Sequence, residues 1–177
     1  MGFRVLLIAV KGKKQETVHN DYSVVTTDKY ESIPESDVTG VLLPSGAYLL
    51  YINDEIIPDE NVFYKLSKNA YLIACYVNET TMQSFVCSWK DGIEEWSVFH
   101  DAQQSIKHLE TIGEVPRQVK SIQDKLFLKQ DNCGDADYIF DIPIELFKNL
   151  GGIDYDQEIE GAKPEPWQVL SRDKCSH

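Results

Sequence analysis

Apolar residues in the first quarter of the chain form one long run followed by a polar segment. Phe3–Val10 is almost wholly apolar and β-branched, which predicts a strand buried on both of its faces. The charged residues after it end this strand, and a weakly patterned helix is predicted over 14–19. Residues 20–40 are polar, so we interpret them as a long surface segment with one short strand at 23–26.

The next elements are marked by turn and capping residues. Val41–Leu43 and Tyr48–Ile52 flank Pro44-Ser45-Gly46, and a Pro-Ser-Gly sequence between two apolar runs predicts a hairpin. Asp59 then stands where an N-cap is expected, ahead of a helix predicted over Glu60–Ser67.

The clearest part of the pattern is a succession of three strands. Tyr71–Val77, Gln83–Lys90 and Ile93–Phe99 combine alternation with β-branched and aromatic residues. Asp91-Gly92 joins the last two and is the strongest short hairpin signal, because a type I′ turn needs positive φ at both central positions. With a further short strand at 105–110, these segments predict an antiparallel meander.

The last third of the chain predicts helices and then a tail. Pro116 suits the first turn of a helix that runs to about Lys129, and a second helix is predicted over Ile144–Leu150, with Asp141 as its cap. The expected fold is α+β: an antiparallel meander sheet with two or three helices packed on one face. Residues 1–160 are interpreted as a single domain, and 161–177 as a loosely packed or extended tail anchored by Trp167.

The cysteines and the N-terminus indicate a cytoplasmic protein. The four cysteines, Cys75, Cys87, Cys133 and Cys175, do not have metal-ligand spacing. The first two lie in apolar strand-like runs, where a thiol behaves as a small hydrophobe. Residues 1–10 lack the features of a secretory signal, so reduced, structural cysteines are expected. No apolar run approaches the ~20 residues that a membrane helix needs.

Negative charge is concentrated in one part of the chain. The formal net charge is −12, from 29 acidic and 17 basic residues among 177. Residues 131–160 contain nine acids and one base, Lys148, whereas 117–129 contain four bases and one acid. An acidic surface of this kind repels nucleic acid and anionic lipid, and it attracts basic partners.

Several short segments stand in a characteristic order along the chain: LPSG (43–46), CYVNE (75–79) with Met82, WKDG (89–92), WSV (96–98) with His100-Asp101, HLE (108–110) and DYIFDIPIEL (137–146). In this order they resemble a family of uncharacterised small bacterial proteins, and the resemblance spans about residues 1–155. The DYIFDIP-type motif is the most specific of them. This resemblance implies a cytosolic bacterial domain without an assigned activity, and by analogy with proteins of similar size and acidity it suggests an immunity protein.

Other chemistry has less support in the sequence. Asp135, Asp137 and Asp141 could bind a hard cation, but the spacing of a calcium loop is missing. His100 and Asp101 are neighbours on a strand and so point to opposite faces, which favours a structural role over catalysis. No glycine-rich phosphate loop is present. We therefore expect no metal, no cofactor and no nucleotide.

The sequence predicts a protein-binding inhibitor, specifically an immunity protein that neutralises a basic, nuclease-like bacterial toxin. The expected partner-binding residues are Asp135, Asp137, Asp141, Glu145, Asp154 and Asp156, with Trp96 as an apolar anchor. One alternative is a small enzyme or ligand-binding protein with a pocket on the sheet near Trp96, His100 and the residues before Glu79. Another is an interaction module that homodimerises through its sheet.

Overall fold

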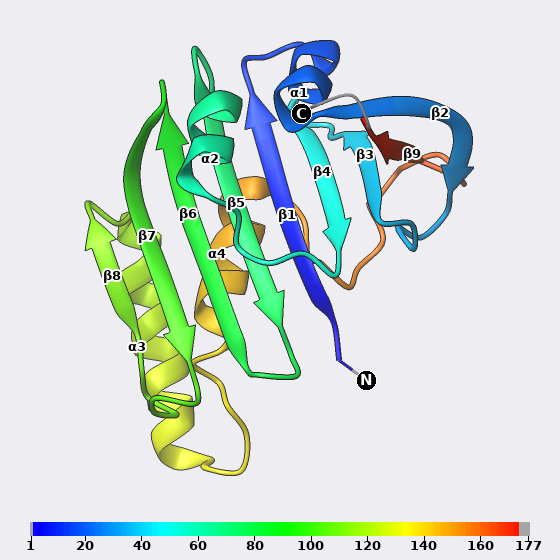
Figure 1. The fold of residues 1–177 in the computed structure, drawn as a ribbon. Coiled ribbons are helices and arrows are strands. Elements are labelled where there is room, and N and C mark those ends of the chain that lie inside the picture. Colours follow the sequence, from blue (N-terminus) through cyan, green and yellow to red (C-terminus); the bar gives the residue numbers. More distant parts are fainter. Residues whose placement is uncertain (1, 174–177) are drawn as a thin grey trace.

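The computed structural model describes residues 2–173, which form one nine-stranded antiparallel sheet and four helices (Figure 1). The strands in chain order are β1 (Arg4–Lys11), β2 (Val24–Glu31), β3 (Val38–Leu42), β4 (Tyr48–Asn53), β5 (Tyr71–Asn78), β6 (Gln83–Lys90), β7 (Ile93–Asp101), β8 (Glu110–Gly113) and β9 (Trp167–Arg172). The helices are α1 (Gln15–Tyr22), α2 (Glu60–Ser67), α3 (Arg117–Asn132) and α4 (Asp141–Gly151). The order across the sheet is β2-β9-β3-β4-β1-β5-β6-β7-β8. The predicted α+β class and its meander, β5 to β8, are confirmed.

The sheet is covered on both faces, and β1 shows why. Its side chains alternate between two buried clusters, Val5 and Leu7 on one face and Leu6 and Ile8 on the other. Helices α3 and α4 cover the first face, as expected of a pair of helices on one side. The second pair, α1 and α2, covers the opposite face, because β1, β4 and β5 present apolar side chains there as well.

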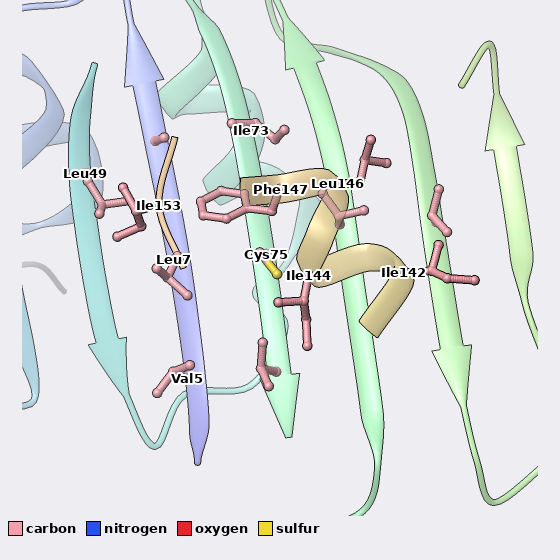
Figure 2. Close-up of a cluster of buried hydrophobic side chains, with 14 of the residues drawn as sticks. Val5, Leu7, Leu49, Ile73, Cys75, Ile142, Ile144, Leu146, Phe147 and Ile153 are labelled. Atoms are coloured by element: carbon pink, nitrogen blue, oxygen red, sulfur yellow. The ribbon is translucent and has the colours of Figure 1, made fainter. Parts of the chain in front are cut away.

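Helix α4 seals the centre of its face. Ile142, Leu146 and Phe147 pack from the helix onto the sheet, where they join Leu7 and Cys75 in one buried cluster (Figure 2). Each of these five side chains is almost fully buried. The packing fixes α4, and with it the polar residues on the helix surface that faces away from the sheet.

The turn residues behave as the sequence predicts. Asp91 and Gly92 both have positive φ, 50° and 81°, as a type I′ turn between β6 and β7 requires. Gly46, with φ of 86°, closes the β3–β4 hairpin, and the carboxylate of Asp59 accepts a hydrogen bond from the backbone N–H of Asn61 at the start of α2. The two turns fix the register of the strand pairs that they join, and the Asp59 cap fixes the start of α2.

Several boundaries differ from the prediction. The short strand expected at 23–26 is the longer β2, and β3 begins at Val38, inside the segment interpreted as surface loop. The fourth meander strand, expected at 105–110, is β8 at Glu110–Gly113, because His108 is instead held by contacts to the end of β7. Asp141 does not cap a helix that begins at Ile144; it lies in the first turn of α4, and Phe140 holds the N-cap position without a side-chain hydrogen bond.

The expectation of a loosely packed tail is wrong for residues 167–172. They are extended, but as β9 they pair with β3 on one side and β2 on the other. Trp167 is buried and packs edge to face against Tyr51, with ring centroids 5.5 Å apart, so its predicted role as an anchor is confirmed. The end of the described chain is therefore held in the sheet by β2 and β3 and by the packing of Trp167.

The described cysteines match the structural interpretation in part. Cys75 and Cys87 are buried, and burial raises the pKa of both thiols, whereas Cys133 is exposed; all three are free. Cys175 and His177 lie outside the described residues. Within residues 2–173, no helix is long and apolar enough to cross a membrane.

Candidate functional site

Four of the acidic residues nominated from the sequence line one groove beside α4. Asp141 and Glu145 lie one turn apart on the helix, and Asp154 and Asp156 lie on the segment that follows it. We call this space, of about 490 Å³, the α4 groove. The i, i+4 spacing on a helix places two carboxylates on one side, and the return of the chain after Gly152 brings up the other two.

The carboxylates of the α4 groove repel one another in the free protein. Burial, followed by the nearby carboxylate of Glu145, raises the pKa of Asp141 to about 6. Among residues 2–173, Lys148 is the one base in the groove lining, where it makes an ion pair of 3.0 Å with Asp154. The charge of Lys129 offsets part of the rise in the pKa of Asp141. The Nζ of Lys125 reaches Glu145 only at 4.0 Å. Like charges are thus held close together with incomplete compensation.

A larger cavity lies on the other side of the same segment. This space, of about 620 Å³, is named here the Tyr155 cavity, and it is bounded by Phe3, the loop at 32–35, the end of β4 and residues 154–158. Its lining includes three acids that were not nominated from the sequence, Glu35, Asp54 and Glu158. Nothing in the local sequence marks the first two: Asp54 directly follows β4, and Glu35 lies in the β2–β3 loop, which Asn53 holds through hydrogen bonds to Pro34 and Ser36.

The segment between the two spaces is fixed by Tyr155. The backbone carbonyl of Tyr155 accepts a hydrogen bond of 3.0 Å from the hydroxyl of Tyr51, and its own hydroxyl donates to Glu79 at 2.6 Å. Just before it, Ile153 is buried against the sheet near Leu49 (Figure 2). Acidic residues 154, 156 and 158 are therefore presented from an anchored backbone.

Together with a third groove that shares Asp154 and Gln157 with them, these spaces make one continuous acidic surface. In the described part of the chain, eight acids line the three spaces, against one base, Lys148. We call the eight the acidic face: Glu35, Asp54, Asp141, Glu145, Asp154, Asp156, Glu158 and Glu160.

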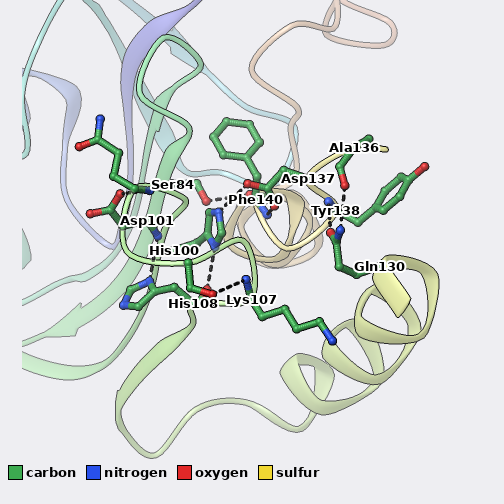
Figure 3. Close-up of polar contacts among 12 residues, drawn as sticks. Ser84, His100, Asp101, Lys107, His108, Gln130, Ala136, Asp137, Tyr138 and Phe140 are labelled. Carbon is green, nitrogen blue, oxygen red and sulfur yellow. Dashed lines mark hydrogen bonds and ion pairs between the residues drawn. The ribbon is translucent and has the colours of Figure 1, made fainter. Parts of the chain in front are cut away.

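Asp137, although nominated, does not belong to the acidic face. Its side chain is 8% exposed, and one carboxylate oxygen bonds to Nε2 of His100 at 2.8 Å (Figure 3). The other oxygen accepts the backbone N–H of Phe140 at 3.1 Å. Asp137 is thus a buried, paired group that ties the α3–α4 loop to β7, and the prediction that it contacts a partner is wrong.

The protons of this pair follow from its hydrogen bonds. Nδ1 of His100 lies 2.7 Å from the backbone carbonyl of His108, which can only accept, so Nδ1 carries a proton. A second proton must lie between Nε2 and Asp137, since two lone pairs would repel each other. His100 is wholly buried. Its orienting carboxylate comes from Asp137, in agreement with the expectation that Asp101 cannot fill that role.

The rest of the α3–α4 loop is held by Gln130. Its side-chain amide donates to the carbonyl of Ala136 and its oxygen accepts the backbone N–H of Tyr138, at 2.9 and 2.8 Å (Figure 3). Asp135, in the same loop, is exposed and lines none of the three spaces. The structure therefore does not bring it to the acidic face.

Trp96 cannot serve as a surface anchor. Its side chain is 5% exposed and belongs to the buried cluster under α3 and α4, so that part of the prediction is wrong. With His100 buried as well, neither side chain on which the alternative sheet pocket depends is open to a ligand. Among residues 2–173, no group of three or more His, Cys, Asp or Glu side chains is arranged to hold a metal ion.

Comparison with known proteins adds no identity. The chain matches no protein-family model, no curated protein and no solved structure. The resemblance carried by the DYIFDIP-type motif stays a prediction, and the function must be argued from the acidic face.

Proposed function

We propose that the acidic face binds a basic protein and that this protein is an inhibitor, specifically an immunity protein that neutralises a basic, nuclease-like bacterial toxin. The observation that carries the proposal is the crowding of carboxylates in the α4 groove, where Asp141 is half-buried and its pKa is raised to about 6. A cationic group bound there would reduce the repulsion among these carboxylates.

The shape and position of the face support the same conclusion. Its acids come from the β3 and β4 regions, from α4 and from the segment after α4, so the charge covers a broad area rather than one deep pocket. A nuclease carries its positive charge in the cleft that binds phosphates. An acidic surface seated in that cleft would exclude the substrate and would accelerate association by electrostatic attraction.

Protection of cells is the direct test. Under this proposal the gene adjacent to this one encodes a toxin, and its basic domain would be co-expressed with the wild-type chain and with a triple charge reversal, Glu145→Lys, Asp156→Lys and Glu158→Lys. We expect the wild type to restore growth and the triple variant to fail, while its circular dichroism spectrum and melting temperature stay close to wild type.

A matched control separates the face from net charge. Asp28→Lys, Glu60→Lys and Glu114→Lys change the charge by the same amount at exposed residues that line none of the three spaces. This variant should protect as well as wild type. Protection by the face variant equal to that by the control would refute the proposal.

A further inference from the structure

The Tyr155 cavity differs from the α4 groove in having aromatic walls. Phe3 is 46% exposed at its rim and packs edge to face on Tyr155, with ring centroids 5.5 Å apart. Ile33, 57% exposed, also lines this cavity, from the loop at 32–35. Large apolar side chains left open beside carboxylates are an unusual combination on a protein surface, and they suit a ligand with both a flat apolar face and a positive charge.

The carboxylates of this cavity are available to such a ligand. Five acids line it, and within residues 2–173 no Lys or Arg does. Asp54 and Asp154 have ion-pair partners outside the cavity, in Arg4 and Lys148. In that same described part of the chain, no ion pair is made by the other three: Glu35, Asp156 and Glu158.

The walls are held in place before any ligand arrives. Asn53 donates two side-chain hydrogen bonds, to the carbonyls of Pro34 and Ser36 at 2.8 and 2.9 Å, which fix the loop that carries Glu35. On the other side, Glu79 accepts from the backbone N–H of Phe3 at 2.8 Å and from the hydroxyl of Tyr155. A binding site fixed in this way loses little conformational entropy when it is filled.

We propose that the Tyr155 cavity receives an arginine side chain of the basic partner. This inference rests on the proposed function and names the group that the partner inserts. A guanidinium is planar, stacks on aromatic rings and donates forked hydrogen bonds to carboxylates, whereas a lysine ammonium is a strongly hydrated point charge. The aromatic wall of Phe3 and Tyr155 beside Asp156 and Glu158 matches the first of these groups.

The test uses a small probe and needs no partner. N-acetyl-arginine amide would be titrated into the ¹⁵N-labelled chain at low salt, with N-acetyl-citrulline amide as the uncharged isostere and N-acetyl-lysine amide as the ammonium control. We expect saturable shifts of the backbone amides at 153–158 and of Phe3, with a dissociation constant on the order of 1 mM for arginine. Citrulline should give no saturable shift, and lysine should bind several-fold more weakly.

Two variants locate the binding. Asp156→Asn with Glu158→Gln should weaken arginine binding at least threefold, whereas Asp28→Asn with Glu114→Gln should leave it unchanged. Equal binding of lysine and arginine, or shifts spread over the surface and insensitive to the first pair of changes, would overturn the assignment.

Failure of the probe to bind, together with cell protection that still depends on the acidic face, would remove this inference alone. Probe binding by a chain that does not protect cells from the toxin would instead contradict the proposed function.

Discussion

Asp137 and Asp141 lie four residues apart in the same acidic stretch, yet the structure treats them in opposite ways. Asp137 is buried and paired with His100, and its second oxygen accepts the Phe140 amide. Asp141 is half-buried among other carboxylates, and its pKa is raised to about 6. The difference shows that one charge cluster in a sequence can contain both a buried, paired aspartate and an aspartate whose charge is opposed by burial and by neighbouring carboxylates.

The largest expected loss of stability comes from breaking the pair of Asp137 and His100. Asp137→Ala would leave the buried His100 without its partner, and breaking a buried pair in this way costs about 3–5 kcal/mol. Urea unfolding at pH 7 measures the loss in the free energy of unfolding. Asp135→Ala, two residues away and exposed, should stay within about 0.5 kcal/mol of wild type.

Asp137→Asn tests whether hydrogen bonds alone can hold this pair together. The amide oxygen can still accept the Phe140 N–H, and the amide nitrogen can donate to Nε2 of a neutral His100 that keeps its Nδ1 proton. This variant should therefore lose less than half as much stability as Asp137→Ala. Equal losses in the two variants would show that the hydrogen bonds of the pair have been misassigned.

A smaller effect, of opposite sign, is expected at Asp141. Because its folded pKa of about 6 exceeds the ordinary value of 3.8, the folded state holds the proton more tightly and loses stability as pH rises from about 4 to about 6. Asp141→Asn should be more stable than wild type at pH 7, by about 1 kcal/mol after allowance for solvent screening.

The pH profile checks the cause. The difference between wild type and Asp141→Asn should vanish below about pH 4 and grow between pH 4 and pH 6, as followed by thermal unfolding. A variant less stable than wild type at pH 7 would mean that Asp141 is a stabilising group, and the contrast with Asp137 would be lost.

The smallest change in stability is expected at Lys148, the one base among residues 2–173 that lines the same three spaces as the acidic face. Lys148→Gln removes a surface ion pair with Asp154, which should alter the free energy of unfolding by less than about 0.5 kcal/mol. The same change makes the face more negative, so association with the basic partner should become about twofold faster. Lys90→Gln, at an exposed position remote from the face, serves as the control.

The sequence predicted the centre of the fold well, because its signals there are local. Alternation in β5 to β7, the Asp91-Gly92 turn and the Asp59 cap each specify their own structure within a few residues. Strand β9 was missed for the opposite reason. Its segment is short and follows a stretch rich in proline and charge, and only pairing with β2 and β3 makes it a strand.

The residues of the candidate site also fall into two groups, those that the local sequence indicates and those that only the tertiary structure brings in or removes. Asp141 and Glu145 were nominated from the local density of acids, and they lie one turn apart because α4 begins at Asp141 rather than at Ile144. Glu35 and Asp54 could not be predicted, because the tertiary structure alone brings them to the Tyr155 cavity. Burial removed Trp96 and Asp137 from the predicted surface, and a single sequence contains no local sign of whether a tryptophan or an aspartate is buried.

The most direct test of the acidic face is the association rate constant with the domain encoded next to this gene, measured by stopped flow from low to high salt. We expect fast association that falls steeply with salt. We also expect the Glu145, Asp156 and Glu158 charge reversal to lower the low-salt rate about tenfold to a hundredfold and to flatten the salt dependence. A rate and a salt dependence that the reversal leaves unchanged would contradict it.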